Sequence, residues 1–205
     1  MNLGNRINSK NSFIRIEHTR PDAIATICQT LLSWTPVVPR EYVVVFVGTD
    51  RSTGDALGPL AGSYLSELKP KHLTIYGTLH QPIHATNMEE SLAHIYHVHH
   101  NPFIIAVDAC LGKTSSIGTI IAERAPLKPG AALNKTLPEI GDVHITGVVN
   151  VSGFMSYAVL QNTRLSIVVD MAKKIAATFE ALDQQLTYYS VPTAMKRLSP
   201  DNQTV

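Results

Sequence analysis

Short apolar stretches rich in Val and Ile alternate along this chain with longer stretches in which apolar residues recur every three or four positions. A short, uninterrupted apolar run is typical of a strand whose two faces are both buried. On this pattern, strands are expected at residues 41–48, 72–78, 102–109 and 117–124. Residues 143–150 are either a further short strand or a loop.

The longer stretches have the spacing of helices that place one apolar face against a sheet. Helices are expected at residues 20–34, 55–68, 87–99 and 151–161. Residues 164–182 are ambiguous, because the first six could form a strand, but the apolar residues fall at helical steps and favour one long helix. Pro59 is tolerated if its helix begins at Leu57 or Gly58, and Asn87 is suited to cap the next helix.

The alternation of strands and helices predicts the fold class. Strands joined by helices form right-handed crossovers, which align the strands in parallel and place helices over both faces of the sheet. We therefore expect an α/β protein with three layers and a mostly parallel sheet. The 205 residues are expected to form a single domain over 1–205, with a core from about residue 20 to residue 186 and loose ends at 1–12 and 198–205.

The composition narrows the function classes. Hydrophobic residues make up 44% of the chain, and 17 basic against 16 acidic residues give a formal net charge of +1. This balance gives no electrostatic basis for binding nucleic acid or an anionic membrane, and no apolar run approaches the ~20 residues that span a bilayer. The N-terminus lacks the apolar core of an export signal, and two distant cysteines fit a reducing compartment, so a cytoplasmic location is expected.

Two acidic residues are expected to meet at one edge of the sheet. Asp55 lies in the turn "VGTDRSTGDALGP" after the strand at 41–48, and Asp108 ends the strand at 102–109. Since binding sites of open parallel sheets lie beyond the carboxyl ends of the strands, these two carboxyl groups could share a proton and activate a water molecule. They could instead hold a divalent metal with His144 as a third ligand, and no other cofactor is indicated.

Each of these residues also has a structural explanation. Asp55 stands where a helix N-cap is expected, Asp108 could cap a turn at its strand end, and His144 could be a solvated side chain. His80 and His84 follow the strand at 72–78 and could reach the same edge, which is left open. No dinucleotide fingerprint, P-loop or nucleophile elbow is present in the sequence.

Several segments of the chain resemble one known family. They are "VVVFVGTDRSTGDALGPLAG", "GTLHQPIHATNMEE", "PFIIAVDACLG" with "IGTI" soon after, and "HITGVVNVSGFMSYAVLQNTRLSIVVDMAK". Together they are similar to the YyaC-type sporulation proteins, a family also described as spore proteases, over about residues 41–182. More distantly, "TGDALGP" and "VDA" resemble the aspartate motifs of the germination protease and segments of the nickel-hydrogenase maturation endopeptidases, which implies a phosphorylase/hydrolase-like fold.

The resemblance implies roles for individual residues. Asp55 stands at the carboxylate of the first loop, Asp108 at the aspartate after the middle strand, and His144 at the histidine that contacts metal in the maturation endopeptidases. Asp50 is a turn residue or supports the neighbouring site. The chain is therefore expected to be a sporulation-related peptidase with a protein or peptide substrate, in the cytoplasm of the sporulating cell or spore. A non-catalytic scaffold or regulator, a metal-dependent maturation-type endopeptidase and a homo-oligomer stay open.

Overall fold

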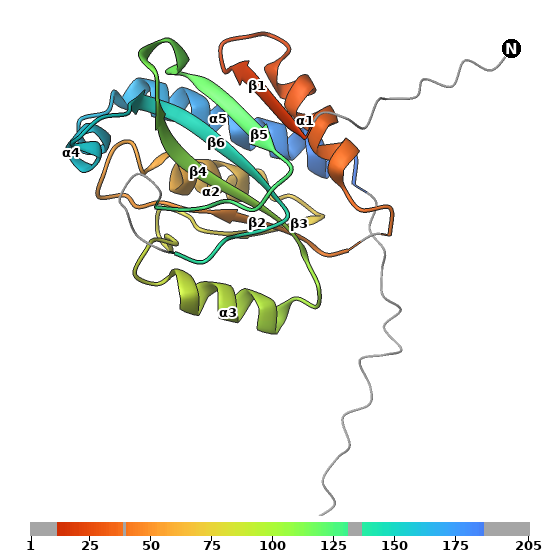
Figure 1. Cartoon of the computed structure of the whole chain (residues 1–205). Coiled ribbons are helices and arrows are strands. Elements are labelled where there is room, and N and C mark those ends of the chain that lie inside the picture. The colour runs from red at the N-terminus through yellow and green to blue at the C-terminus, as the bar shows by residue number, and fades with distance from the viewer. Residues whose placement is uncertain (1–11, 39, 131–136, 187–205) are drawn as a thin grey trace, which may run out of the picture.

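In the part of the chain that the structure describes, the sheet has six strands in the order β1-β5-β6-β4-β2-β3, and helices cover both of its faces (Figure 1). The computed structural model describes residues 12–38, 40–130 and 137–186. The strands are β1 (Phe13–Glu17), β2 (Tyr42–Phe46), β3 (Leu73–Tyr76), β4 (Phe103–Gly112), β5 (Thr119–Glu123) and β6 (Val143–Val151). The expected strands are confirmed, and the segment that could have been a loop is the strand β6.

Most neighbouring strands run in parallel. β2 pairs in parallel with β3 and with β4, and β4 pairs in parallel with β6, whereas β5 is antiparallel to both β1 and β6. The predicted fold class is therefore confirmed. The carboxyl ends of the adjacent strands β2, β4 and β6 lie at one edge of the sheet, where the site of such a fold is expected.

The long helices of the described residues are divided between the two faces of the sheet (Figure 1). The first face is covered by α1 (Ala23–Trp34), α2 (Leu57–Glu67) and α5 (Leu165–Asp183), and the second by α3 (Met88–Val98). The short helix α4 (Ser156–Gln161) follows β6. In β2, Val44 and Phe46 join the first core and Val43 and Val45 join the second, which explains why this strand has no polar position.

The sheet begins earlier than the sequence pattern suggests. β1 (Phe13–Glu17) pairs with β5, so the sheet includes residues ahead of the expected core start at residue 20. In β1 only Ile16 is buried, while Phe13 and Arg15 are exposed, a one-sided pattern that is typical of a short strand at the edge of a sheet. The expected loose ends lie outside the described residues, apart from Ser12.

The expectation that Asp55 caps a helix is wrong. α2 begins at Leu57 with Ala56 at the N-cap position, and no side chain makes a capping hydrogen bond. A backbone hydrogen bond closes the turn before α2 instead, because the N–H of Ala56 donates to the Ser52 carbonyl (3.0 Å). The Asp55 carboxyl is therefore not committed to the helix.

Asn87 also acts differently from a helix cap. It precedes α3 but makes no capping hydrogen bond. Its side-chain oxygen accepts from the N–H of His84 (2.8 Å), and its side-chain N–H donates to the Pro82 carbonyl (2.9 Å). Asn87 thereby fixes the loop that leads from β3 to α3.

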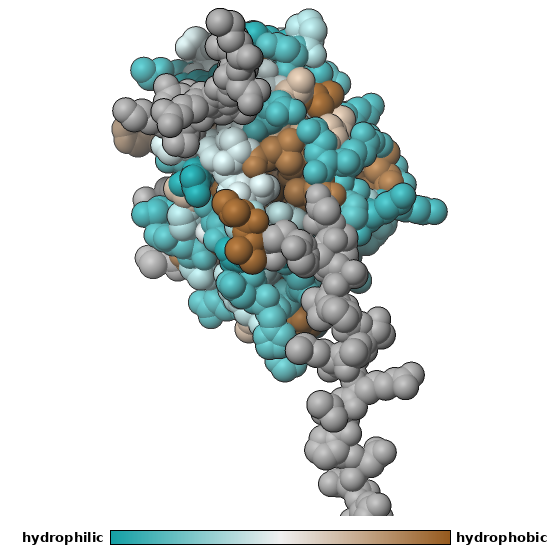
Figure 2. Space-filling model, turned by 90° about the vertical axis from the view of Figure 1, so that its right-hand side faces the viewer, coloured by the Kyte–Doolittle hydropathy of each residue, from teal (hydrophilic) through white to brown (hydrophobic). Residues whose placement is uncertain are grey.

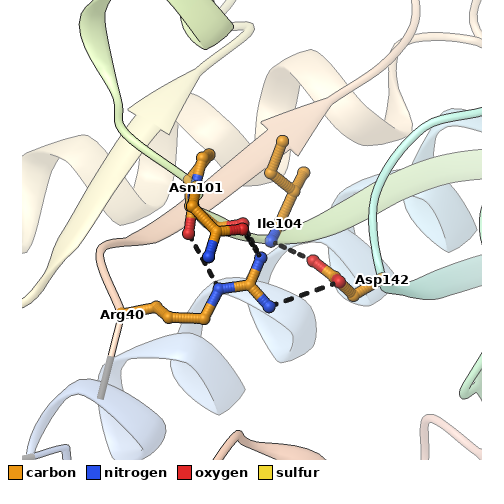
Figure 3. Close-up of polar contacts among 5 residues, drawn as sticks. Arg40, Asn101, Ile104 and Asp142 are labelled. Atoms are coloured by element: carbon orange, nitrogen blue, oxygen red, sulfur yellow. Dashed lines mark hydrogen bonds and ion pairs between the residues drawn. The ribbon is translucent and has the colours of Figure 1, made fainter. Parts of the chain in front are cut away.

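A clasp of polar contacts ties the loops at the amino ends of β2, β4 and β6 together (Figure 3). The Arg40 guanidinium donates to the carbonyl of Asn101 (2.8 Å) and to the carbonyl of Pro102 (2.6 Å). It also lies 3.7 Å from the Asp142 carboxylate, which accepts the N–H of Ile104 (2.9 Å). The clasp joins three segments, with Arg40 before β2, residues 101–104 at the start of β4 and Asp142 before β6, so it fixes how the three strands begin.

One face of the molecule is mostly polar. Figure 2 shows the side of the molecule that lies at the right in Figure 1, where hydrophilic residues separate the hydrophobic patches. Among the described residues, no helix combines the length and apolarity needed to cross a membrane.

Replacing Asp142 by Ala is expected to destabilise the protein by about 1–3 kcal/mol, because the N–H of the buried Ile104 loses its acceptor. Asp142→Asn keeps an oxygen at this position and is expected to cost less. Urea unfolding of both variants and the wild type measures the difference. Equal stabilities of the Ala and Asn variants would show that the hydrogen bond to Ile104 is not what Asp142 contributes.

Candidate active site

A pocket of about 460 Å³ lies at the carboxyl ends of β2, β4 and β6. Its walls come from the loop after β2, the end of β4, the loop before α3, the segment after β5 and the α4 region. The polar side chains of the lining include Asp55, Asp108, His84, Thr146 and Tyr157. The structure thus brings the two predicted acids, 53 residues apart in sequence, into a single pocket.

The loop that carries Asp55 is shaped by an abrupt turn at Gly48. Val47 still bonds to β4, its N–H donating to the Val107 carbonyl (2.7 Å), but Gly48 has a φ of +144° and directs the chain out of the sheet. A Cβ atom at Gly48 would overlap the carbonyl oxygen of Asp55. The same carbonyl accepts the N–H of Thr49 (3.2 Å), so the loop closes on itself and returns Asp55 to the end of β2. Only glycine fits this conformation and this close approach.

A second glycine sets the start of α2 against the sheet. A Cβ atom at Gly58 would overlap the carbonyl oxygen of Val47, so the helix can begin directly above the end of β2 only because this residue has no side chain. The N–H of Gly54 also donates to the Leu160 carbonyl in α4 (2.8 Å). The Asp55 loop is therefore held from three sides, by β2, by α2 and by α4.

Asp108 reaches the pocket through the alternation of β4. Ile104 and Ala106 belong to the core beneath α3, and since side chains in a strand alternate between faces, Asp108 faces the same side. It lies next to Thr146 of β6 in the ladder. Its Oδ1 atom accepts the N–H of Ala109 (2.7 Å), which fixes one carboxyl oxygen and leaves the other free to face the pocket.

Burial changes the acidity of both carboxyl groups. Loss of solvent raises the pKa of Asp108 to about 8, the nearby charge of Asp55 adds to the rise, and the hydrogen bond from Ala109 opposes it. Burial also raises the pKa of Asp55, against the opposing effect of the neighbouring Ser52 hydroxyl.

The difference between the two acids follows from their positions. Asp108 lies within a central strand, where protein atoms surround it, whereas Asp55 lies on a loop at the rim. At neutral pH Asp108 therefore keeps its proton. Two carboxyl groups in one pocket that differ in burial can take separate acid and base roles.

His144 and Asp50 do not reach the pocket. His144 is part-buried on β6, two residues before Thr146, and its Nδ1 atom lies 2.8 Å from the Ala125 carbonyl oxygen. Its Nε2 atom lies 3.8 Å from the Glu123 carboxylate. Asp50 is exposed, and its carboxylate accepts from the Thr49 hydroxyl at 3.4 Å.

A metal site made of Asp55, Asp108 and His144 does not fit this arrangement. The histidine is directed to Ala125 and Glu123 rather than to the two acids. Across residues 12–38, 40–130 and 137–186, no group of three or more His, Cys, Asp or Glu side chains is arranged to hold a metal ion. The two aspartates therefore stand without a third ligand of these types among the described residues.

The sequence left open whether His80 and His84 reach this edge. His84 lines the pocket, with its Nδ1 atom 2.9 Å from the Thr86 hydroxyl, whereas His80 does not. Other pocket residues were not expected from the sequence. Ser152, Ser156 and Tyr157 reach the pocket from the segment that follows β6. The signal for them was present, because this segment leaves the carboxyl end of a parallel strand.

The fold resembles that of a solved protease. The structure of the NiFe hydrogenase maturation protease HycI from Thermococcus kodakarensis KOD1 superposes with a TM-score of 0.51 at 18% sequence identity, over 72% of this chain and 95% of that chain. At this identity the likeness shows a common fold. It agrees with the fold that the resemblance to maturation endopeptidases implied.

Sequence comparison gives a closer relationship. The chain is 49% identical over 171 residues to the "Uncharacterized protein YyaC" of Bacillus subtilis (strain 168), covering 82% of this chain and 83% of that protein. The expected resemblance to YyaC-type proteins is thereby confirmed. Residues 15–178 match the model of the family described as "Protein of unknown function (DUF1256)". The chain belongs to the DUF1256 family.

Proposed function

We propose that this protein is a peptidase in which Asp55 and Asp108 activate a water molecule for attack on a peptide bond. The observation that carries this proposal is the shared pocket, in which one carboxyl group is protonated at neutral pH beside another that is closer to solvent. Peptidases that have no nucleophilic side chain can use two carboxyl groups, one protonated and one ionised, to activate water for hydrolysis. The likeness to the fold of a maturation protease supports the same class of reaction.

The positions of the two acids assign their roles. Asp55, in its ionised form, is the general base that accepts a proton from the attacking water. Asp108, in its protonated form, donates a hydrogen bond to the carbonyl oxygen of the substrate as negative charge develops there. The bond from Ala109 to Oδ1 of Asp108 leaves the other oxygen to carry the proton.

The reaction balances within this pair. Attack of water forms a tetrahedral intermediate while Asp55 takes up the proton of the water. Collapse of the intermediate breaks the C–N bond, and the proton held by Asp55 passes to the leaving amine. Asp108 keeps its proton throughout, so both groups return to their starting state after one turnover.

The biological setting is part of the proposal. The resemblance to YyaC-type sporulation proteins supports a role in the sporulating cell or spore, and the composition supports a cytoplasmic location. The substrate is a protein or peptide, a class that the likeness to the fold of a maturation protease supports and that suits a pocket lined by both apolar and polar groups.

Replacing either acid by asparagine is expected to lower the rate of peptide hydrolysis by about 10²–10⁴-fold, the usual contribution of one general acid or base. Cleavage of a pooled peptide library by wild type, Asp55→Asn and Asp108→Asn, followed by mass spectrometry, measures this. Asp170→Asn, an exposed position on α5, is the matched control and is expected to cleave at the wild-type rate. Cleavage by either active-site variant at the wild-type rate would exclude the proposed pair and favour a scaffold or regulator.

The rate of hydrolysis is expected to depend on pH with two limbs. On the acid side the rate falls as Asp55 takes up a proton, at a pH above the ordinary value of 3.8 because burial raises its pKa. On the alkaline side it falls as Asp108 loses its proton near pH 8. Any residual activity of Asp108→Asn should lack the alkaline limb, and an unchanged limb in that variant would assign it to another group.

The stability of the folded protein is expected to change with pH in a direction set by Asp108. Its pKa rises from 3.8 in the unfolded chain to about 8 in the folded state, so the folded state holds the extra proton between these values. The contribution of protonated Asp108 to the free energy of unfolding is complete below pH 3.8 and is lost as the pH rises through about 8. Denaturant unfolding from pH 5 to 8 should show a smaller loss of stability in Asp108→Asn than in the wild type, and parallel curves would contradict the raised pKa.

A further inference from the structure

Strand β4 continues beyond the end of its neighbour β2. The last paired residues of these two strands are Phe46 and Val107, whereas on its other side β4 pairs with β6 as far as Gly112. Beyond Val107, β4 therefore has a neighbour on one side only. The turn at Gly48 removes the chain that would have continued β2 alongside it.

The vacated position beside β4 is part of the pocket. Gly48 and Thr49, where β2 would have continued, line it together with Ala109, Cys110 and Leu111 of β4. The pocket therefore lies where one more strand segment would complete the sheet.

The direction of the backbone groups shows which of them face this space. The N–H and C=O of one strand residue point to the same neighbouring strand, and successive residues alternate. Val107 points to β2, because its carbonyl accepts the N–H of Val47 (2.7 Å). Gly112 points to β6, because its carbonyl accepts the N–H of Ser152 (2.8 Å). Ala109 and Leu111 therefore face the pocket.

Of the N–H and carbonyl groups of Ala109 and Leu111, three are available to hydrogen-bond with a ligand. The N–H of Ala109 donates to Oδ1 of Asp108. The carbonyl of Ala109 and the N–H and carbonyl of Leu111 face away from β6 and lie beyond the last residue pair of β2 and β4, so neither strand bonds to them. In the described part of the chain, no backbone bond from a turn or loop reaches them either. A donor flanked by acceptors at strand spacing matches the backbone of an extended polypeptide.

We infer that the pocket binds an extended polypeptide segment as an added strand along residues 109–111 of β4. The alternate side chains of this segment point to the two faces of the sheet. On the α3 side they meet apolar residues of the lining, among them Met88 and Leu127, and on the other side they meet Leu160. The peptide bond beside Ala109 lies next to Asp108, so strand pairing sets the register of cleavage.

This inference rests on the proposed function only in taking a polypeptide as the occupant, because binding and cleavage can be measured apart. The binding experiment uses full-length Asp108→Asn, which keeps the oxygen that accepts from Ala109. A pool of acetylated octapeptides of random sequence is enriched on this protein. The tightest binder is then resynthesised with a single N-methyl group at each amide in turn.

Added-strand pairing predicts a period of two. Methylation of amides that face β4 should weaken binding about tenfold, the effect of losing a backbone hydrogen bond together with a steric clash. Methylation of the intervening amides should change the dissociation constant less than about threefold, since they face away from the sheet. A uniform or irregular pattern, or a pool from which nothing is enriched, overturns the inference.

The matching change on the protein is Leu111→Pro, with Leu111→Ala as control. Proline removes the edge N–H, which does not point to β6, and proline is tolerated at such edge positions. Against Leu111→Ala, the proline variant should bind the selected peptide about tenfold more weakly, with thermal unfolding checking that both fold. Equal affinities overturn the inference, and if Leu111→Pro does not fold, the N-methyl series alone decides.

These experiments test the added strand and the peptidase activity independently of one another. A period of two without cleavage by the wild type keeps the added strand and removes the peptidase. Cleavage without a period of two keeps the peptidase and removes the added strand.

Discussion

The early end of β2 is the constraint on which the site depends. At Gly48 the chain leaves the sheet with a φ of +144°, and the Asp55 carbonyl occupies the position where a side chain would begin. This one turn returns Asp55 to the strand end and exposes the edge of β4. It also creates the space that becomes the pocket. A residue with a side chain at position 48 would have to displace the loop, and all three consequences would be lost together.

The acidic residues at the two ends of the sheet, Asp142 and Asp108, have different partners. At the amino ends, Asp142 is matched by Arg40 and by the N–H of Ile104, so its charge contributes to fixing three strand starts. At the carboxyl ends, the Asp108 carboxyl accepts the N–H of Ala109 and has no ion pair among the described residues, and burial raises its pKa to about 8. A buried carboxyl group without a cationic partner lowers stability when it ionises. The ion pair of Arg40 and Asp142 therefore lies where it stabilises the strand starts, whereas Asp108, which has no such partner among the described residues, lies at the pocket.

Much of the fold could be predicted from the sequence, because buried strands such as 41–48 and helices with a clear apolar face leave strong patterns. β1 was missed because five residues with one buried side chain carry little signal. The antiparallel direction of β5 could not be predicted either, since its apolar run resembles those of the parallel strands. Asp55 was expected at a helix cap from its residue type, but the backbone bond between Ala56 and Ser52 already closes that turn.

Site residues could be predicted from the sequence where they lie at the carboxyl ends of predicted strands. Asp55 and Asp108 were found because the carboxyl ends of parallel strands meet at one edge, and this topological rule needs no knowledge of side-chain contacts. The position of His144 could not be deduced in this way. It shares a face of the sheet with Thr146, a pocket residue, but it lies two residues nearer the amino end of β6, where the Ala125 carbonyl and Glu123 are its neighbours.

That displacement of two residues has a chemical consequence. A positively charged imidazole in contact with the two acids would favour ionisation of both and lower their pKa values. His144 is instead held at the Ala125 carbonyl and Glu123, and the pKa of Asp108 is set by burial, the N–H of Ala109 and the charge of Asp55. The placement of His144 away from the two aspartates is therefore consistent with the raised pKa of Asp108, on which the proposed acid–base pair depends.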